Sequence, residues 1–375
     1  MSDTGLTLLS TVTEEGKLQL SLKSLPIPEP QENEVVIKVE AAPINPSDLA
    51  LLTYPSDAST GVTSGSGADT TYTADIPEVM IKSVQARAGK PLPVGNEGAG
   101  VVVKAGSSDA AQAMLGKTVA AVGGGMYAQY RCLNIAQVMV LKEGTTAREG
   151  ASSYVNPMTA LSFVDNMKKD GFKGIIHTAA ASNLGQMLNK ICLADGINLI
   201  NIVRKEEQVA LLKDQGAKYV LNSSSDSFKA DLVAAIKETE AYMCFDAIGG
   251  GSLGNDILAC MEKAAASGEE QIGPYGSNQF KQLYIYGGLD FSPTVIKRGF
   301  GFSWGINAWL LTPYLAKASQ ETKMKLVMRI VNEITTTFAS SYQQEVSLQD
   351  ALNVENVATY TKQRTGEKFL INPSL

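Results

Sequence analysis

Residues 174–205 have the residue types and spacing of a phosphate-binding unit. The stretch begins with a short apolar run at Ile175 and Ile176, passes through a turn of small residues at 178–182, and continues as a helix. The apolar residues of that helix recur at i, i+3, i+4 and i+7, namely Leu184, Met187, Leu188 and Ile191. A second β-branched run follows at 197–203. The order strand, tight turn, helix, strand is that of the βαβ unit that binds dinucleotides.

Backbone N–H groups at the start of this helix are the predicted contacts for a pyrophosphate. Small side chains let a phosphate approach the turn, and the first N–H groups of a helix point at its oxygens. We expect these groups to come from Ala181, Ser182, Asn183 and Leu184. Ser182 and Asn183 stand where a dinucleotide fingerprint usually has glycines, so the phosphate contacts depart from the usual form. A purely structural strand-to-helix corner is the alternative interpretation.

Two basic residues, Arg204 and Lys205, end the second strand of this unit. A site for NAD usually has an Asp or Glu there to hold the ribose hydroxyls, whereas a basic side chain suits the 2′-phosphate of NADP. The first acidic residue, Glu206, comes only after both of them. We therefore predict NADPH as the cofactor. The alternative is a solvated strand end that binds nothing.

The composition is that of a globular protein with room for two domains. The chain has 375 residues, of which 44% are apolar and 19% are charged, and its net charge is −6. This acidic balance, without a basic cluster, argues against a nucleic-acid partner. No apolar run approaches about 18 residues, the length that a membrane span needs. The N-terminal residues are acidic where a signal peptide would be basic. We expect a soluble, cytoplasmic protein that does not bind membranes.

The cysteines and the histidine are too scattered for a zinc site of the His and Cys type. The four cysteines form no CxxC pair and are Cys132, Cys192, Cys244 and Cys260. Cys192 and Cys244 fall in apolar patterns, which predicts buried free thiols. His177 is the single histidine, and its place in the first strand of the dinucleotide unit indicates a structural role. No metal site is predicted.

The first half of the chain consists of short strands separated by glycine corners. Residues 34–45 alternate apolar and polar side chains, and glycine turns at 95–100 and 123–125 meet further strands. This pattern is typical of a partly closed antiparallel barrel. The segment 56–75 is rich in Ser, Thr, Gly and Ala and has no periodicity. We interpret it as a surface loop or lid.

The second half alternates strands and helices. Helices are expected at 206–215 and 227–239, each followed by a β-branched or aromatic strand. Repeated alternation of this kind predicts a doubly wound parallel sheet. An aromatic run at 300–309 then either lines an apolar pocket or a dimer seam, or packs in the core. The last segment, 348–373, is expected to return to the barrel as a helix and a strand.

Short motifs along the chain match one known family in their order. They are AAPINPSD at 41–48, PLPVGNEGAGVVVKAGSS at 91–108, GGGMYAQY at 123–130, NPMTAL at 156–161, HTAAASNLGQML at 177–188, EEQVALLKDQGAKYVLNS at 206–223, FDAIGG at 245–250 and TKQRTGEKFL at 361–370. With these motifs the chain resembles the medium-chain dehydrogenase/reductase superfamily, in its zinc-free quinone oxidoreductase and 2-enoyl thioester reductase branch. Asn45 and Asn96 stand where zinc-dependent relatives have a Cys and a His. The segment 56–75 looks like an insertion in that family.

The resemblance implies an α/β fold of two domains. Residues 1–153 and 316–375 would form a GroES-like, partly closed β-barrel catalytic domain, and residues 154–315 a Rossmann domain with a doubly wound parallel sheet. It implies hydride transfer from NADPH to a quinone or an activated alkene such as an enone, without zinc. The alternatives are a 2-enoyl thioester reductase, or a cofactor-binding regulatory or structural protein with little turnover. A homodimer is expected from the family habit of pairing nucleotide domains.

The resemblance also suggests individual site residues. Asn45 would lie beside the nicotinamide and orient the ring or donate to a substrate oxygen, unless its amide only satisfies its own turn. Tyr54 lies near a family position that carries a tyrosine proton donor, with packing as the alternative. Asn156 and Thr159 fall at the start of the cofactor-facing helix, where Asn156 could instead be a helix cap. Lys368 is a candidate for a cofactor or strand-end contact.

Overall fold

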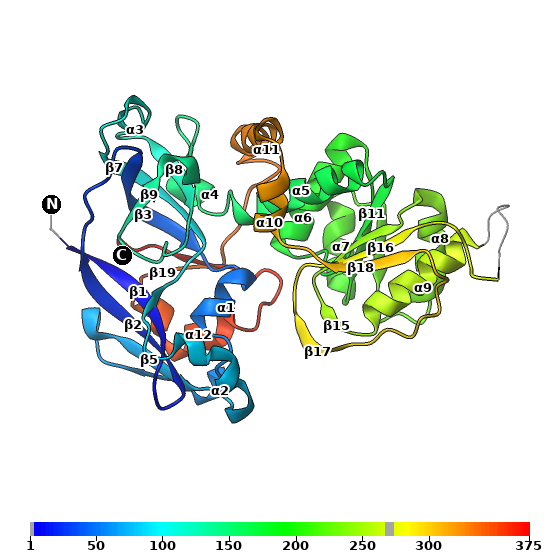
Figure 1. The fold of residues 1–375 in the computed structure, drawn as a ribbon, viewed down its shortest axis with the longest axis horizontal. Coiled ribbons are helices and arrows are strands. Elements are labelled where there is room, and N and C mark those ends of the chain that lie inside the picture. Colours follow the sequence, from blue (N-terminus) through cyan, green and yellow to red (C-terminus); the bar gives the residue numbers. More distant parts are fainter. Residues whose placement is uncertain (1–3, 267–273) are drawn as a thin grey trace. The chain divides into compact units, whose positions relative to one another are not determined.

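The computed structural model describes residues 4–266 and 274–375. The chain packs into two compact units (Figure 1). Unit 1 comprises Met1–Val155 and Arg329–Leu375, and unit 2 comprises Asn156–Met328. The domain limits expected from the sequence are 153/154 and 315/316. Because the chain leaves unit 1 and returns to it, the core of unit 1 is built from segments far apart in the sequence.

Unit 1 is built from two sheets that share one apolar core. The first has the strand order β4-β5-β2-β1-β6, and the second has the order β10-β8-β7-β3-β20-β19, with β9 also paired to β3. The strands of the first sheet are β1 (Thr4–Val12), β2 (Lys17–Pro26), β4 (Val62–Ser64), β5 (Thr71–Asp75) and β6 (Leu92–Pro93). Those of the second are β3 (Glu34–Pro43), β7 (Glu97–Ala105), β8 (Thr118–Val122), β9 (Tyr130–Asn134), β10 (Val138–Val140), β19 (Gln344–Val346) and β20 (Phe369–Ile371). Side chains from both sheets, such as Leu20 and Ile37, are fully buried in the shared core.

Short helices complete unit 1. They are α1 (Leu49–Leu52), α2 (Glu78–Val84), α3 (Asp109–Gln112), α4 (Ala147–Gly150) and α12 (Val354–Tyr360). The returning segment ends in β20, which pairs antiparallel with the end of β3 through Leu370 and Ile371. The expected return of the last segment as a helix and a strand is therefore confirmed.

The interpretation of residues 56–75 as an irregular lid is wrong. This segment contributes β4 and β5 to the first sheet, where β5 pairs antiparallel with β2 over Lys17–Ser21 and Thr71–Asp75. Tyr72 and Ala74 point into the core and are buried. Two inward apolar residues make too short an alternation to stand out among Ser, Thr and Gly, and the strand is specified mainly by its backbone pairing with β2.

Unit 2 is a six-stranded parallel sheet with helices, as predicted. The strand order is β13-β12-β11-β14-β16-β18. Its strands are β11 (Gly174–His177), β12 (Asn198–Val203), β13 (Tyr219–Asn222), β14 (Met243–Asp246), β16 (Lys281–Ile285) and β18 (Trp304–Ala308). The helices are α5 (Val155–Lys169), α6 (Asn183–Asp195), α7 (Glu206–Asp214), α8 (Phe228–Thr239), α9 (Leu253–Ala265), α10 (Leu311–Lys317) and α11 (Gln320–Glu333), the last of which continues into unit 1. Apolar strand residues such as Ile176 and Ile200 are fully buried, as in sheets covered on both faces.

The strand order reverses at β11, which lies between β12 and β14. In open α/β sheets, ligands bind beyond the carboxyl ends of the strands at such a switch point. The turn that follows β11 is the small-residue turn identified in the sequence. A separate parallel pair, β15 (Gly249–Gly251) with β17 (Asp290–Thr294), follows β14 and β16 in the chain.

The aromatic run at 300–309 is largely core. Phe300 and Trp309 are buried, whereas Phe302 is exposed. Trp309 meets Phe163 of α5 edge-on at 4.7 Å between ring centroids, and its indole N–H donates to Asn166 Oδ1 at 2.9 Å. These contacts fasten β18 and the residues after it to α5.

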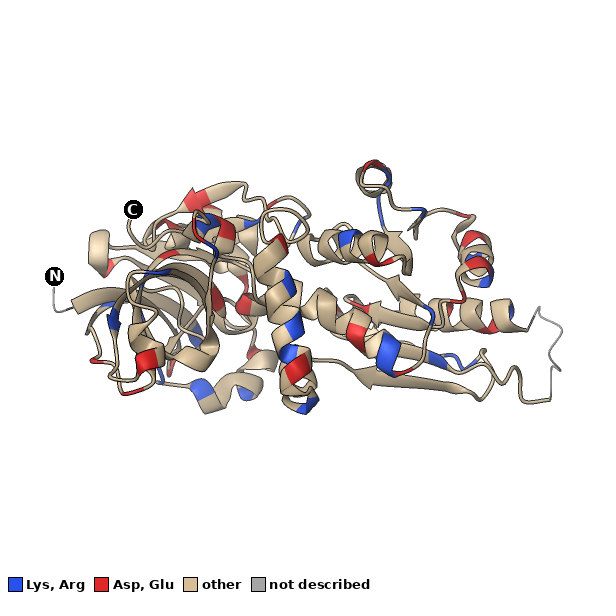
Figure 2. Cartoon of the chain, turned by 90° about the horizontal axis from the view of Figure 1, so that it is seen from above, with Lys and Arg blue, Asp and Glu red and all other residues tan. Residues whose placement is uncertain are grey.

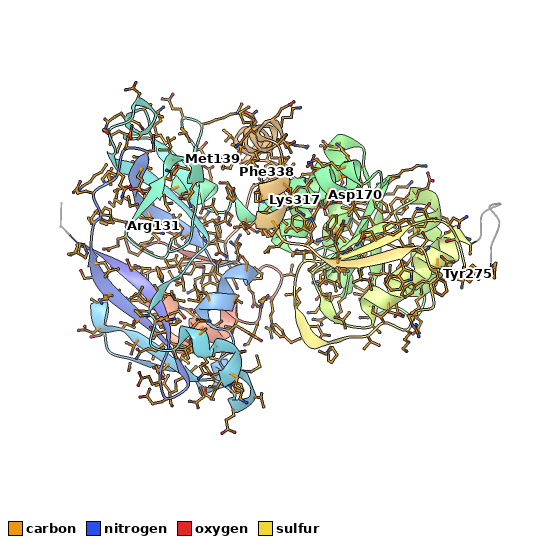
Figure 3. All side chains as sticks on the ribbon, in the orientation of Figure 1. Arg131, Met139, Asp170, Tyr275, Lys317 and Phe338 are labelled. Atoms are coloured by element: carbon orange, nitrogen blue, oxygen red, sulfur yellow. The ribbon has the colours of Figure 1, made fainter. Side chains whose placement is uncertain are left out.

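The far end of α5 is held in the same way. Asp170, labelled in Figure 3, accepts hydrogen bonds from Asn166 Nδ2 at 2.6 Å and from Tyr284 Oη at 3.1 Å.

Basic and acidic residues are interspersed along the ribbon (Figure 2). Among the described residues, no helix combines the length and the apolar character that crossing a membrane requires.

Candidate active site

The turn between β11 and α6 has the geometry of a phosphate-binding corner without the usual glycines. Ser182 caps α6, and its Oγ accepts a hydrogen bond from the N–H of Gly185 at 3.2 Å. The backbone of Ser182 is extended, with φ −64° and ψ 164°. Because any residue adopts that conformation, a side chain at position 182 does not strain the turn.

Two other positions of the turn are the demanding ones. Ala179 has a φ of 50°, the left-handed region that a residue with a side chain enters at a cost of about 1 kcal/mol. Gly185 lies so close to the turn that an added Cβ would fall 2.2 Å from the carbonyl oxygen of Ala180. Gly185 thus allows α6 to pack closely against the turn, which is the role of the third glycine in the usual dinucleotide-binding motif. Nothing in the sequence pointed to Ala179.

A polar clasp joins this turn to the next strand end. Thr178 Oγ1 donates to Asp246 Oδ1 at 2.6 Å, and the carboxylate also accepts the N–H groups of Ile248 and Gly249 at 3.0 and 3.1 Å. Asp246 is buried at the end of β14. The clasp therefore fixes the carboxyl ends of β11 and β14 relative to each other. Sequence reasoning missed both partners, although Asp246 lies in the FDAIGG motif.

The two basic residues after β12 are exposed and held by their backbone. The N–H of Arg204 donates to Gln208 Oε1 and its carbonyl accepts from Ser224 Oγ, both at 3.2 Å. The ammonium group of Lys205 lies 3.5 Å from Glu207 Oε1, an exposed pair that contributes little energy. Exposed cationic side chains at this strand end can accommodate a 2′-phosphate.

His177 has the structural role expected of it. It is fully buried, and its Nε2 lies 2.8 Å from Tyr286 Oη. Burial lowers the pKa of the imidazole to about 3, so the ring is neutral at physiological pH. Cys192 and Cys244 are buried free thiols, as predicted. Within residues 4–266 and 274–375, no group of three or more His, Cys, Asp and Glu side chains is arranged to hold a metal ion.

In unit 1, the candidate residues converge on the carboxylate of Glu97, at the start of β7. Glu97 is buried, and its Oε1 accepts a hydrogen bond from Asn45 Nδ2 at 2.8 Å. Its Oε2 accepts the backbone N–H groups of Tyr154 and Val155 at 2.9 and 2.8 Å. Burial raises the pKa of Glu97, opposed by the nearby charge of Lys368 and by these hydrogen bonds.

A second buried carboxylate shapes the turn that carries Asn45. Asp48 accepts the N–H of Asn45 on one oxygen and the N–H of Asn96 on the other, both at 2.7 Å. Its removal from water raises the pKa of this carboxyl to about 7, although both hydrogen bonds act in the opposite direction. The side chain therefore ties the 45–48 turn to the residues just before β7.

Lys368 belongs to the same polar cluster. Its Nζ donates to Ser152 Oγ at 2.7 Å, and Tyr342 Oη lies 2.8 Å from the same hydroxyl. Burial lowers the pKa of Lys368 to about 8, while the charges of Glu97 and Asp48 favour the ammonium form. Tyr54 lies after α1 and is about one-third exposed.

The predicted residues thus fall into two sets. Asn45, Tyr54 and Lys368 belong to unit 1, where Asn45 and Lys368 share Glu97 as a neighbour. Unit 2 contains the buried Asn156 and Thr159 near the start of α5, the 181–184 turn, Arg204 and Lys205. Sequence reasoning missed the residues that hold the others in place, namely Glu97, Ser152, Thr178, Asp246 and Tyr342. The GNEG motif, which contains Glu97, was the available signal for one of them.

The residues of unit 2 fit a dinucleotide. The close approach of Gly185 to Ala180 brings the first turn of α6 against the end of β11, so helix N–H groups face the corner where a pyrophosphate would bind. The exposed Arg204 follows the neighbouring strand β12. The groups that would recognise a pyrophosphate and a 2′-phosphate therefore lie at two adjacent strand ends, as in Rossmann folds.

Sequence comparison gives a matching family and several similar proteins. Residues 31–143 match the family described as "Alcohol dehydrogenase GroES-like domain". The mitochondrial enoyl-[acyl-carrier-protein] reductase 2 of Candida tropicalis is 25% identical over 356 residues, which cover 88% of this chain and 80% of that protein. The mitochondrial enoyl-[acyl-carrier-protein] reductase of Xenopus tropicalis is 29% identical over 210 residues, 54% of this chain and only 51% of that protein.

Solved structures extend the likeness over the whole fold. A Mesorhizobium loti protein named as an NADPH:quinone reductase superposes with a TM-score of 0.73 at 25% identity, over 100% of this chain and 99% of that one. An enoyl thioester reductase of Candida tropicalis has a TM-score of 0.69 at 20% identity, over 98% and 99% of the two chains, and shows the shared fold alone. The GroES-like domain and the Rossmann-type parallel sheet confirm the resemblance to the medium-chain dehydrogenase/reductase family and its two-domain fold.

Proposed function

We propose that this protein is an NADPH-dependent reductase that delivers hydride to an electron-poor carbon of a quinone or an activated alkene. The observation that carries the proposal is the β11–α6 corner at the switch point of the parallel sheet, with Arg204 at the end of the adjacent strand. Relatives named for NADPH:quinone and enoyl reduction support the same class of reaction.

The residues of unit 2 are assigned to cofactor binding. The backbone N–H groups of Ala181, Ser182, Asn183 and Leu184 would bind the pyrophosphate, and Arg204, assisted by Lys205, would bind the 2′-phosphate. Bound NADPH would supply the hydride. Because Arg204 and Lys205 have their backbones fixed and their side chains in solvent, they can close on a phosphate without breaking a buried contact.

The polar residues of unit 1 are assigned to orientation and proton supply. Asn45 is held by Glu97 and offers its remaining amide atoms to a ligand. Tyr54, partly exposed after α1, or a water molecule would provide the proton that completes reduction of a double bond. Asn156 and Thr159 lie near the start of α5 and are further candidates for cofactor contacts, and Lys368 is a candidate through its place beside Glu97.

A 2-enoyl thioester reductase is the second candidate. It is favoured by the Candida tropicalis relatives, which align with 88% of this chain and carry that activity in their names. The chemistry would be the same, hydride to one alkene carbon and a proton to the other, with a thioester as the activating group. A regulatory or structural protein that binds NADPH with little turnover is the third candidate function.

We also propose that the protein is cytoplasmic and forms a homodimer.

The test of the cofactor site is a fluorescence titration with NADPH and with NADH. Wild-type protein should bind NADPH more tightly, and Arg204→Ala should weaken NADPH by about tenfold or more while leaving NADH unchanged. Lys218→Ala, which removes an exposed lysine paired with Glu238 in the same unit, is the matched control. Equal affinity of the wild-type protein for the two cofactors would refute the Arg204 assignment.

Turnover then separates the three functions. Oxidation of NADPH is followed at 340 nm with quinones, enones and short 2-enoyl thioesters. Preference for quinones or enones supports the first proposal, and preference for the thioesters supports the second. Tight NADPH binding without oxidation by any acceptor would favour the non-catalytic alternative.

A further inference from the structure

The hydrogen bonds of Asn45 are unequally satisfied. Asn45 is 2% exposed, and its Nδ2 donates to Glu97 Oε1 at 2.8 Å. Its Oδ1 is buried and has no hydrogen-bond partner among the described residues. The N–H of Asp48 donates to the main-chain carbonyl of Asn45 at 2.9 Å. A buried amide oxygen without a partner costs about 1–3 kcal/mol, so such atoms are uncommon in folded proteins.

Glu97 decides which way this amide faces. A carboxylate only accepts hydrogen bonds, so the amide must turn its NH2 group towards Glu97 and its oxygen away. The Glu97 carboxylate cannot rotate to relieve this constraint, because its other oxygen accepts two consecutive backbone N–H groups, those of Tyr154 and Val155. Burial raises the pKa of Glu97, while the charge of Lys368 and the hydrogen bonds from Asn45, Tyr154 and Val155 favour the ionised, acceptor-only form.

The backbone of Asn45 is fixed as well. Its N–H donates to Asp48 Oδ2 at 2.7 Å, and Asp48 is itself held by the N–H of Asn96. Because the main-chain N–H and the side-chain Nδ2 of Asn45 are both hydrogen-bonded, the orientation of Oδ1 is fixed. The two carboxylates thus act on different atoms of Asn45: Asp48 holds its main chain and Glu97 its side chain.

We propose that Glu97 is a positioning residue that presents Asn45 Oδ1 as an acceptor for an N–H or O–H group of the bound ligand. This role rests on the proposed reductase function and refines it. The sequence-based expectation lets Asn45 donate to a substrate oxygen, whereas the Glu97 contact uses one donor hydrogen and leaves the acceptor open. The donor on the ligand belongs either to NADPH or to the substrate that it reduces.

Glu97 also connects this acceptor to the chain segment that leaves unit 1. Tyr154 and Val155, whose N–H groups it binds, are the last residues of unit 1 before Asn156, and Val155 begins α5. One carboxylate therefore sets both the polarity of Asn45 and the first N–H groups of that helix. A substitution of Glu97 that keeps its hydrogen bonds with Tyr154 and Val155 therefore tests its effect on Asn45 alone.

Glu97→Gln is such a change. Glutamine keeps the size of the side chain, and its amide oxygen can still accept from Tyr154 and Val155. Its NH2 group then faces Asn45, and the Asn45 amide must reverse to accept from it. The reversed Asn45 offers N–H instead of oxygen to the ligand, so we expect either the Kd for NADPH or the KM for the acceptor to rise about tenfold. Which constant rises identifies the ligand that carries the donor.

The double variant Asn45→Asp with Glu97→Gln separates this role from simple packing. In it the introduced glutamine amide would donate to one oxygen of the introduced aspartate, and the other oxygen would again be an acceptor for the ligand. Affinity should return to within about threefold of wild type, while Asn45→Asp alone, which opposes two carboxylates, should be the most impaired. Glu34→Gln is the matched control, since Glu34 is a carboxylate of unit 1 that accepts a backbone N–H from Gln31 at 2.9 Å.

Nuclear magnetic resonance of the side-chain amide of Asn45 gives a readout that does not depend on activity. The signal is assigned by its loss in Asn45→Asp, and one of its two protons should exchange slowly in wild type and shift in Glu97→Gln. An Asn45 signal unchanged by Glu97→Gln, or a double variant no better than Glu97→Gln alone, overturns the proposal. If wild type binds NADPH but reduces no acceptor, the reductase assignment fails, while the amide signal and the NADPH titrations still decide the role of Glu97.

Discussion

The hydroxyl of Thr178 lies 2.6 Å from Asp246 Oδ1 and joins the ends of two neighbouring parallel strands. Thr178 follows β11 and Asp246 ends β14, so the bond spans the switch point of the sheet. Asp246 also holds the N–H groups of Ile248 and Gly249, which makes its carboxylate the common acceptor of three donors.

Replacing the Asp246 carboxylate should lower the free energy of unfolding more than removing the Thr178 hydroxyl. We expect Asp246→Asn to lower the free energy of unfolding by about 2 kcal/mol, because its NH2 group would face a donor, and Thr178→Val by about 1 kcal/mol. Urea denaturation of both variants measures the difference. Equal losses would mean that the Thr178 hydroxyl, which also accepts the N–H of Ala247 at 2.8 Å, contributes as much as the whole Asp246 carboxylate.

Gly185 should tolerate no side chain. In Gly185→Ala the new Cβ would lie 2.2 Å from the Ala180 carbonyl oxygen, so α6 must shift away from the turn. We expect a loss of about 1–3 kcal/mol in stability and weaker NADPH binding. Gly299→Ala is the control, since no atom lies within 4 Å of the corresponding Cβ. Unchanged NADPH affinity in Gly185→Ala would argue against a phosphate at this corner.

Ala179 offers a change in the opposite direction. Its φ of 50° is one that glycine adopts without the steric cost of a Cβ. Ala179→Gly should therefore raise the thermal unfolding temperature, by the equivalent of up to about 1 kcal/mol. A lower unfolding temperature would show that the packing of the methyl group and the larger unfolded-state entropy of glycine together outweigh the relief of strain.

His177 should make the protein sensitive to acid. Its pKa is about 3 in the folded protein and 6.5 in the unfolded chain, so the unfolded state binds more protons in the pH range between these values. Stability from the neutral ring is complete above pH 6.5 and falls by up to about 1.4 kcal/mol for each pH unit below it.

The matched variant for this effect is His177→Gln, which can still bond to Tyr286 Oη. Its stability relative to wild type should improve as the pH falls from about 6.5 to about 4.5. Asp48, whose raised pKa of about 7 makes it more stabilising at low pH, is present in both proteins and cancels in the comparison. Parallel stability curves for the two proteins would contradict the assignment.

The buried ion pair of unit 2 should be far more important than the exposed ones. Lys281 is fully buried, with its Nζ 2.7 Å from Glu262 Oε2. Lys281→Met leaves the half-buried Glu262 carboxylate bound by the N–H and hydroxyl of Ser277 and should cost about 1–3 kcal/mol. Lys218→Met removes the exposed pair with Glu238 and should have a far smaller effect, because solvent screens that pair. Similar losses in thermal or urea unfolding would refute this ranking.

Much of the fold could be predicted because its signals are local. The helix 183–195 is recognisable by the spacing of Leu184 and Leu188, and the apolar strands around it by length and flanking glycines. The strand at 71–75 could not be found in this way, because only two of its side chains enter the core and its partner β2 lies some fifty residues earlier.

The residues of the candidate site also differ in whether local sequence could identify them. Ser182 and Arg204 are recognisable because their position relative to a strand and a helix gives them meaning. The contacts Asn45–Glu97 and Lys368–Ser152 span 52 and 216 residues, so no window of sequence contains both partners. Long-range polar contacts of this kind depend on the completed barrel, which local pattern does not describe.

The pairing of β20 with β3 has a consequence for how the protein is made. Every strand of unit 2 leaves the ribosome before Phe369–Ile371 does, so its parallel sheet can form during synthesis. The edge of β3 at Ala42 and Pro43, by contrast, waits for more than three hundred further residues before its partner exists. During that interval the N-terminal barrel strands carry an open edge, and a nascent chain halted in this state would be a natural client for a chaperone.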